Sequence, residues 1–177
     1  DIFQSISQEV QSTALDKTSI IQDQLSQYVD ADAAGKITCK VSTYDGTGFG
    51  EAVAASSVTA TIKTKTVSVT GFDFNPVIAG REGGQRLIIE IPVNVNVEQI
   101  KKAEGEIPSN VEENAGIYHD GNKVGTFNTP KLVTLFATGG EWEYDGNAHP
   151  AKAEVKGATD YTIEYSTDGG IWSEAAP

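Results

Sequence analysis

The segment around residue 143 combines three carboxylates with two aromatic side chains. Glu141, Glu143 and Asp145 alternate with Trp142 and Tyr144. Carboxylates beside aromatic rings could form a sugar-cleaving site, in which one acid protonates the leaving oxygen. In an extended strand, however, alternate residues point to opposite faces, so the acids would share one face and the aromatic rings the other. The pattern therefore favours a solvated strand edge over a packed Trp.

A second acidic segment, residues 30–35 (DADAAG), has the first, third and sixth residues of a calcium-binding loop. Such a loop also needs an oxygen ligand at its fifth position and a bidentate Glu at its twelfth. Ala34 and Val41 occupy those two positions. We interpret the segment as a polar turn before a strand, and we expect neither a metal nor another cofactor.

Nucleophilic catalysis finds little support in the sequence. No Gly-x-Ser-x-Gly motif is present, and His119 and His149 lie beside turn residues without an evident nucleophile. The single Cys, Cys39, has the same parity as Ile37 and Val41, which indicates a small core residue rather than a reactive thiol. We therefore expect no catalytic activity.

β-Strands must position these side chains, because apolar residues recur with period two along most of the chain. The strictest alternation comprises Leu87, Ile89, Ile91, Val93, Val95 and Val97. Pro92 has the opposite parity and indicates an edge or a bulge in this long strand. Turn signals such as Tyr44-Asp-Gly separate the apolar runs. The pattern predicts an all-β fold, an antiparallel β-sandwich.

The period of the pattern divides the chain into three parts. Residues 1–12 begin with apolar residues at helical spacing, and we expect a short helix that ends a preceding domain. Residues 13–135 hold the strands of the sandwich. Residues 136–177 have too few strands to close a second sandwich, so we expect them to be the first half of another β unit. The chain would then be a segment of a longer protein.

Composition limits the partners that the chain can have. Its 177 residues carry a formal net charge of −12, with 13 Lys and Arg against 25 Asp and Glu. Nucleic acids and anionic membranes bind clustered basic side chains, so this balance argues against both as partners. The longest strongly apolar stretch, 87–91, is too short to span a bilayer. One Cys also excludes an intrachain disulfide.

Several short motifs resemble modules of Gram-positive cell-surface proteins. Residues 144–146 (YDG), 155–158 (VKGA) and 165–170 (YSTDGG) are similar to the opening of the YDG-type Ig-like repeats. Residues 22–30 (QDQLSQYVD) and 86–93 (RLIIEIPV) resemble a pilin-like Ig domain that often follows a von Willebrand factor A domain. The initial helix then resembles the end of that A domain, and the resemblance implies an Ig-like β-sandwich.

The resemblance to pilin-like domains implies an intramolecular isopeptide bond. Such a bond joins a Lys to an Asn with the help of a buried acid, because burial deprotonates the Lys and keeps the acid protonated. Lys17 has the parity of Leu15 and Ile21, Asp73 has the parity of Val67 and Val69, and Asn128 precedes the last strand of the unit. The alternative is that Asn128 is a turn residue before Pro130 and that Lys17 is solvated. Bond formation would release ammonia and lower the intact mass by about 17 Da.

The resemblance also implies a function. We expect a non-catalytic structural or adhesive module of a secreted protein attached to the cell wall, in contact with neighbouring domains of the same chain. An alternative is a domain that binds a host protein or a glycan, for which Trp142, Tyr144 and Trp172 are the candidate contacts. A further alternative is an accessory region of a secreted carbohydrate-active enzyme.

Overall fold

The computed structural model describes residues 15–74, 84–147, 149, 151–166 and 169–174. Within these residues the chain consists mainly of antiparallel strands, which confirms the prediction of an all-β fold. The helix predicted for residues 1–12 lies outside the described residues.

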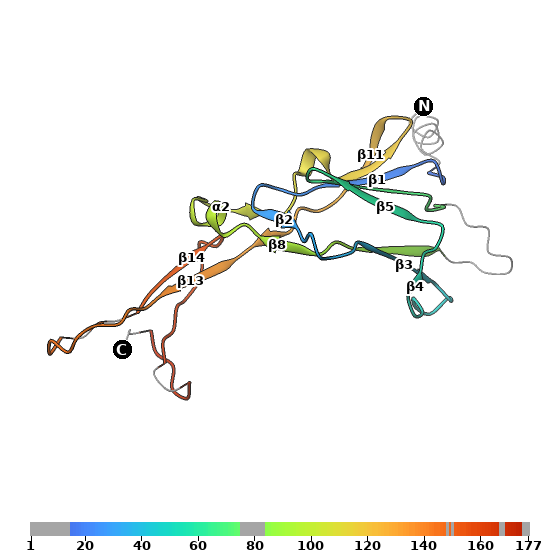
Figure 1. Ribbon diagram of the computed structural model, residues 1–177. Helices are drawn as coiled ribbons and strands as arrows, with labels where there is room; N and C mark the ends of the chain where they lie inside the picture. Colours follow the sequence, from blue (N-terminus) through green and yellow to red (C-terminus); the bar gives the residue numbers. More distant parts are fainter. Residues whose placement is uncertain (1–14, 75–83, 148, 150, 167–168, 175–177) are drawn as a thin grey trace, which may run out of the picture.

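Two sheets face each other in the wider part of the molecule (Figure 1). The first sheet has five strands in the order β11-β10-β1-β6-β5, and the second has three in the order β4-β3-β7. The strands of the first sheet are β11 (Asn122–Thr126), β10 (Gly116–His119), β1 (Ile20–Gln24), β6 (Thr66–Thr70) and β5 (Thr59–Lys63). Those of the second are β4 (Val53–Ala54), β3 (Thr38–Thr43) and β7 (Gln85–Glu90).

The long alternating run predicted from Leu87 to Val97 is divided into shorter elements. Strand β7 ends at Glu90, and pairing resumes between β8 (Val93–Val95) and β2 (Val29–Ala31). Pro92 lies in the interruption, where it has no N–H to donate to a ladder. Beyond β8, the Asn96 side chain accepts a hydrogen bond from the Gln99 N–H and caps a short helix, α2 (Val97–Lys101).

The core is divided between two clusters. Ile21, Val67 and Val69 form the first cluster, between the two sheets. Ile100 of α2 forms the second cluster with Ala103 and Ile107, and the side chains of Leu132 and Phe136 pack against it. The second cluster therefore joins the sandwich to the strands that follow it.

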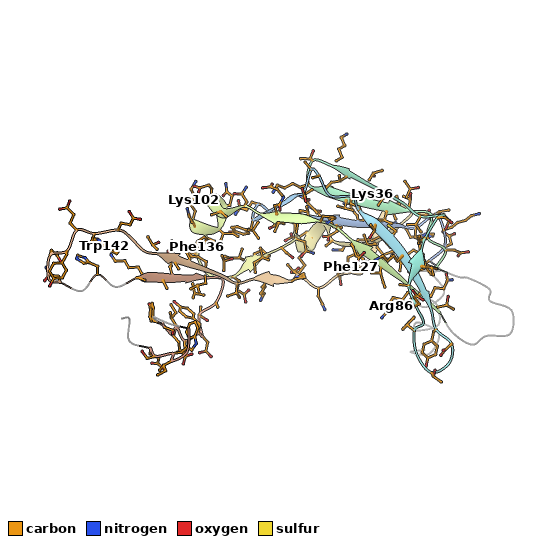
Figure 2. The ribbon with its side chains drawn as sticks, turned by 60° about the horizontal axis from the view of Figure 1, so that its bottom comes forward. Lys36, Arg86, Lys102, Phe127, Phe136 and Trp142 are labelled. Atoms are coloured by element: carbon orange, nitrogen blue, oxygen red, sulfur yellow. The ribbon has the colours of Figure 1, made fainter. Side chains whose placement is uncertain are left out.

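A two-stranded hairpin projects from the end of the sandwich at which α2 lies (Figure 1). It consists of β13 (Thr134–Thr138) and β14 (Lys152–Lys156). A short ladder between β12 (Lys131–Leu132) and β9 (Ile107–Pro108) connects it to the sandwich, and a 3₁₀ turn (Glu112–Asn114) follows β9. Phe136 lies near the base of the hairpin and Trp142 lies towards its tip (Figure 2). The boundary predicted between residues 135 and 136 thus falls inside β13.

Gly157 lies at this joint, directly after β14, with a φ of +87°. A Cβ atom there would lie 2.0 Å from the Leu132 carbonyl oxygen. Gly146 in the hairpin also has a positive φ, of +79°, but a Cβ atom there would meet nothing within 4 Å. The two glycines thus share a backbone conformation and differ in the space around them.

Gly157→Ala should therefore destabilise the protein more than Gly146→Ala. The left-handed conformation costs an alanine about 1 kcal/mol at both positions, and the clash at Gly157 should add about 2 kcal/mol. Urea unfolding followed by circular dichroism measures both variants. Equal losses would show that the joint does not constrain this glycine.

Candidate functional site

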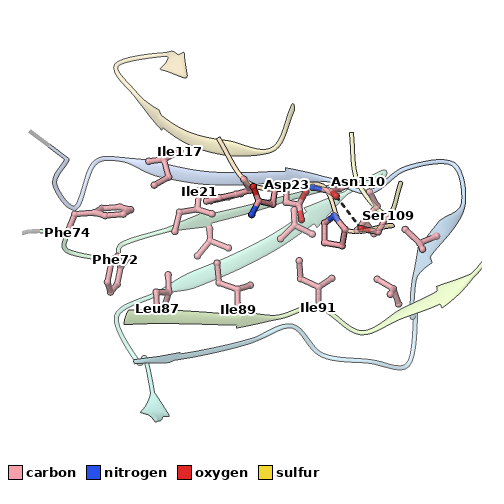
Figure 3. Close-up of a pocket in the computed structure, with 18 of the residues that line it drawn as sticks. Ile21, Asp23, Phe72, Phe74, Leu87, Ile89, Ile91, Ser109, Asn110 and Ile117 are labelled. Atoms are coloured by element: carbon pink, nitrogen blue, oxygen red, sulfur yellow. Dashed lines mark hydrogen bonds between the residues drawn. The ribbon is translucent and has the colours of Figure 1, made fainter. Parts of the chain in front are cut away.

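A cavity of about 640 Å³ opens between the two sheets of the sandwich (Figure 3). Its walls are alternate residues of β1, β6 and β7, among them Ile21, Val69, Leu87 and Ile89. These residues share a wall because every second side chain of a strand points to the same face. The sequence pattern that predicted a packed core therefore also forms the walls of the cavity.

The unequal width of the two sheets explains why the cavity is open. Five strands face three, and one of the three, β4, has only two residues. Contacts between β3 and β5 close one side of the sandwich. On the other side β10 and the chain after β11 contribute Ile117 and Phe127 to the cavity, and both side chains remain partly exposed. An incomplete second layer leaves apolar surface in contact with water.

Asp23 is an acidic group in this apolar wall (Figure 3). It lies between Ile21 and Leu25 on the cavity face of β1. Its Oδ1 atom is buried and has no hydrogen-bond partner among the described residues. Burial raises the pKa of Asp23 above its ordinary value, and a hydrogen bond with the side chain of Asn110 opposes that rise.

Asp23 lies near polar residues that also line the cavity. The Asn110 side chain is buried, and its Oδ1 atom accepts a hydrogen bond of 3.2 Å from the Ser109 hydroxyl. Asn128 lines the same cavity. Neither Asp23 nor Asn110 is among the site residues predicted from the sequence. The parity of Asp23 with Ile21 and Leu25 was the available signal, whereas Asn110 lies in an isolated bridge to Leu25, a long-range pairing that no local pattern predicts.

The sheet register does not bring Lys17 and Asn128 together. Gln22 pairs with Gly116, which pairs with Thr126. Lys17 lies five residues before Gln22. Asn128 lies two residues after Thr126, on the other side of this row of paired residues. Strands β1 and β11 run in the same direction, and Lys17 lies before the start of β1 whereas Asn128 lies after the end of β11. The register therefore places them towards opposite ends of the sheet.

The burial that the isopeptide bond needs is also missing, because Asn128 is exposed and so are the other two residues, Lys17 and Asp73. Residues 17 and 18 form a turn and β1 begins only at Ile20, so the parity that predicted an inward Lys17 does not apply. Gly71, with a φ of +83°, interrupts the alternation after β6, so Phe72 is buried and Asp73 is exposed.

The predicted aromatic contacts are accessible. Trp142 and Trp172 are more than half exposed, and Tyr144 is 99% exposed. One face of Trp142 is covered, because the ring of His149 stacks on it with 4.8 Å between centroids. His149 Nε2 lies 2.9 Å from Asp145 Oδ1, and hydrogen bonds from Asn147 and His149 lower the pKa of Asp145 to about 2. The carboxylate of Asp145 therefore forms its hydrogen bonds with neighbouring residues between β13 and β14.

His119 has a serine partner that lies 100 residues away in the sequence. The Ser19 hydroxyl lies 3.0 Å from His119 Nδ1, and Asp120 Oδ2 lies 3.6 Å from Nε2. The three residue types are those of a hydrolase triad. Ser19 is only 1% exposed, however, so a substrate has no access to its hydroxyl. The arrangement fastens the start of β1 to the end of β10.

In the acidic segment 30–35, the carboxylate of Asp30 already has partners within the protein. Asp30 Oδ1 forms a 2.8 Å ion pair with Lys65 Nζ, and the side chain of Asn96 donates to Asp30 Oδ2. These two hydrogen bonds lower the pKa of Asp30. Among the described residues no group of three or more His, Cys, Asp and Glu side chains could hold a metal ion.

Cys39 packs against the first core cluster, as its parity predicted. Burial raises the pKa of its thiol, which disfavours the reactive thiolate.

Comparisons with known proteins identify no relative. No family model, no curated protein and no solved structure matches the chain. None of the helices in the described ranges is both long enough and apolar enough to cross a membrane.

Asp23→Asn should stabilise the protein at neutral pH. The raised pKa means that the unfolded carboxyl loses its proton at a lower pH than the folded one, so stability falls as the pH rises from about 3.8 through the folded value. Asparagine preserves the shape and removes the charge, which should gain about 1 kcal/mol at pH 7. Urea unfolding at pH 7 and pH 4 should show the gain shrinking at the lower pH.

Asp30→Asn is the matched control, because the pKa of Asp30 is lowered rather than raised. It should destabilise the protein at pH 7. A loss of stability for Asp23→Asn as well would mean that the buried carboxylate is favourably solvated in the folded state.

The register also changes the expected intact mass. Since Lys17 and Asn128 lie towards opposite ends of the sheet, folded protein should have its full sequence mass, and so should Lys17→Arg after allowance for the substitution. High-resolution mass spectrometry distinguishes this result from the loss of about 17 Da that the bond would produce. Such a loss, mapped to a Lys17–Asn128 peptide, would contradict the register.

Proposed function

We propose that the chain is a non-catalytic structural and adhesive module of a secreted, cell-wall-attached bacterial surface protein. The observation that carries the proposal is the serial arrangement of β units: the sandwich and the β13–β14 hairpin follow one another along the long axis (Figure 1). The resemblance of the YDG and pilin-like motifs to surface proteins supports the same function. A module of this kind transmits force between its neighbours instead of transforming a substrate.

The joint between the two units is suited to transmitting force. Ile100 and Ile107 are fully buried, and Leu132 and Phe136 pack against them. The β9–β12 ladder adds backbone pairing across the same joint. A hairpin held by an apolar cluster and a ladder cannot rotate freely about the sandwich, so the units would keep their alignment under load.

Strand β1 is suited to bearing the load. It lies between β6 and β10 and pairs with both in antiparallel register. It starts at the end of the molecule opposite the hairpin and runs along the long axis (Figure 1). A pull along that axis would load the hydrogen bonds on both sides of β1 in parallel, so they would have to break together.

Ligand binding is a second candidate function for the hairpin and the segment after it. Tyr144, Ile171 and Trp172 are exposed, and such aromatic and aliphatic groups can stack on a sugar or pack against a protein. The stacked pair of Trp142 and His149 would present a firm surface in the hairpin itself. An adhesive module would combine this surface with the mechanical role of the sandwich.

Single-molecule stretching of the chain between its two ends tests the mechanical role. Ile21→Ala truncates a buried residue of β1, which is 8% exposed, and should lower the force needed to unfold the sandwich. Ile62→Ala makes the same change on the edge strand β5, where the side chain is 39% exposed, and should leave that force almost unchanged. Equal effects, or unfolding at negligible force without substitution, would count against a load-bearing role.

A further inference from the structure

We propose that the cavity between the sheets is a groove for an extended segment of a partner protein, which adds as a strand beside β7 and places a basic side chain at Asp23. This inference goes beyond the structural role and does not depend on it. Three features of the groove support it: an unpaired strand edge, an elongated apolar wall and a partly buried carboxylate.

The unpaired edge belongs to β7. In the described part of the chain β7 pairs only with β3, so its other edge presents backbone N–H and C=O groups without a ladder. Natural proteins usually protect such an edge with charges, a bulge or a covering segment. The charged side chains of β7 are engaged elsewhere: Arg86 lies over the Phe49 ring and Glu90 pairs with Lys40. Edges of this kind accept peptides by strand addition.

The apolar wall has the repeat of an extended peptide. Leu87, Ile89, Ile91 and Val93 line the cavity at every second position. Leu87 and Ile89 belong to β7, whereas Ile91 and Val93 follow its end at Glu90, so the edge that β7 itself offers is six residues long, roughly 20 Å. All four side chains remain partly or largely exposed, whereas Val67 and Val69 on the opposite sheet are only 1% and 2% exposed. A strand added beside β7 would extend the second sheet and point its own alternate side chains toward the first sheet, next to those of β7.

The partly buried carboxylate specifies the charge of the occupant. Asp23 is partly buried in the wall of the groove, where its carboxylate forms a hydrogen bond with the Asn110 side chain while its Oδ1 atom has no hydrogen-bond partner among the described residues. A buried acceptor is costly when unpaired and favourable when it meets a donor, most of all a cation. The occupant should therefore carry a Lys or Arg among its inward-facing apolar residues.

The net charge of the chain favours a partner protein over a second copy. Each copy carries −12, so two copies repel one another, whereas a basic segment is attracted to the same surface. The length of the wall favours a peptide over a compact small molecule, which would leave much of β7 uncovered. The occupant to which these features point is an extended basic and apolar peptide.

Binding of a synthetic peptide to the full chain tests the proposal. The probe has about ten residues, with Val alternating with Thr and one central inward-facing Lys. The matched peptide has Leu in place of that Lys. Titration calorimetry should show that the Lys peptide binds about tenfold more tightly than the Leu peptide, and that Asp23→Asn removes this preference. The comparison of two peptides on the unmodified chain does not depend on how the variant folds.

Hydrogen exchange locates the bound peptide. The backbone amides of β7 should gain protection, whereas those of β5, the edge strand of the other sheet, should not. Protection of β5 alone, no binding of either peptide, or a Lys preference that survives Asp23→Asn would overturn the proposal. A dimer that protects β7 in sedimentation and exchange experiments without peptide would overturn it in favour of a second copy.

Discussion

The pairing of β1 with two neighbours is the constraint on which the rest of the structure depends. Its ladders with β6 and β10 fix the level of every strand in the larger sheet. They place Asp23 on the inner face, between Ile21 and Leu25, and they separate Lys17 from Asn128. Both the candidate groove and the absence of a crosslinking geometry follow from this one register, because a shift by a single residue would turn Asp23 outward.

Two polar contacts fix the ends of β1. At its start, the Ser19 hydroxyl forms a hydrogen bond with Nδ1 of His119, the last residue of β10. Beyond its end, Lys65 Nζ donates to the backbone carbonyls of Ser26 and Val29 and pairs with Asp30. This cation holds the segment that carries the chain from β1 towards β2. The protein has 25 acidic residues and only 13 basic ones, and the half-buried Lys65 contacts three acceptors at once.

The sequence predicted those features that depend on neighbouring residues in one strand. The alternation of Leu87, Ile89 and Ile91 predicted an inward face, and the structure confirms it. Parity failed where the backbone leaves the strand, at Gly71 and at the turn before β1, because one left-handed or turn residue resets the alternation. Contacts between residues far apart in the sequence, such as Ser19 with His119, cannot be predicted from the alternation within one strand.

The candidate site was harder to predict than the fold, because it arises from what the second sheet does not cover. Local pattern gives each strand an apolar face but does not say how many strands will oppose it. Here a five-stranded layer meets a three-stranded one, and Ile117 and Phe127 are left partly exposed. Asp23 would be a simple destabilising substitution in a closed sandwich. In an open sandwich, the same carboxylate is the acidic group of an apolar groove. Because the second sheet is incomplete, a residue that destabilises the fold can also determine which ligands bind.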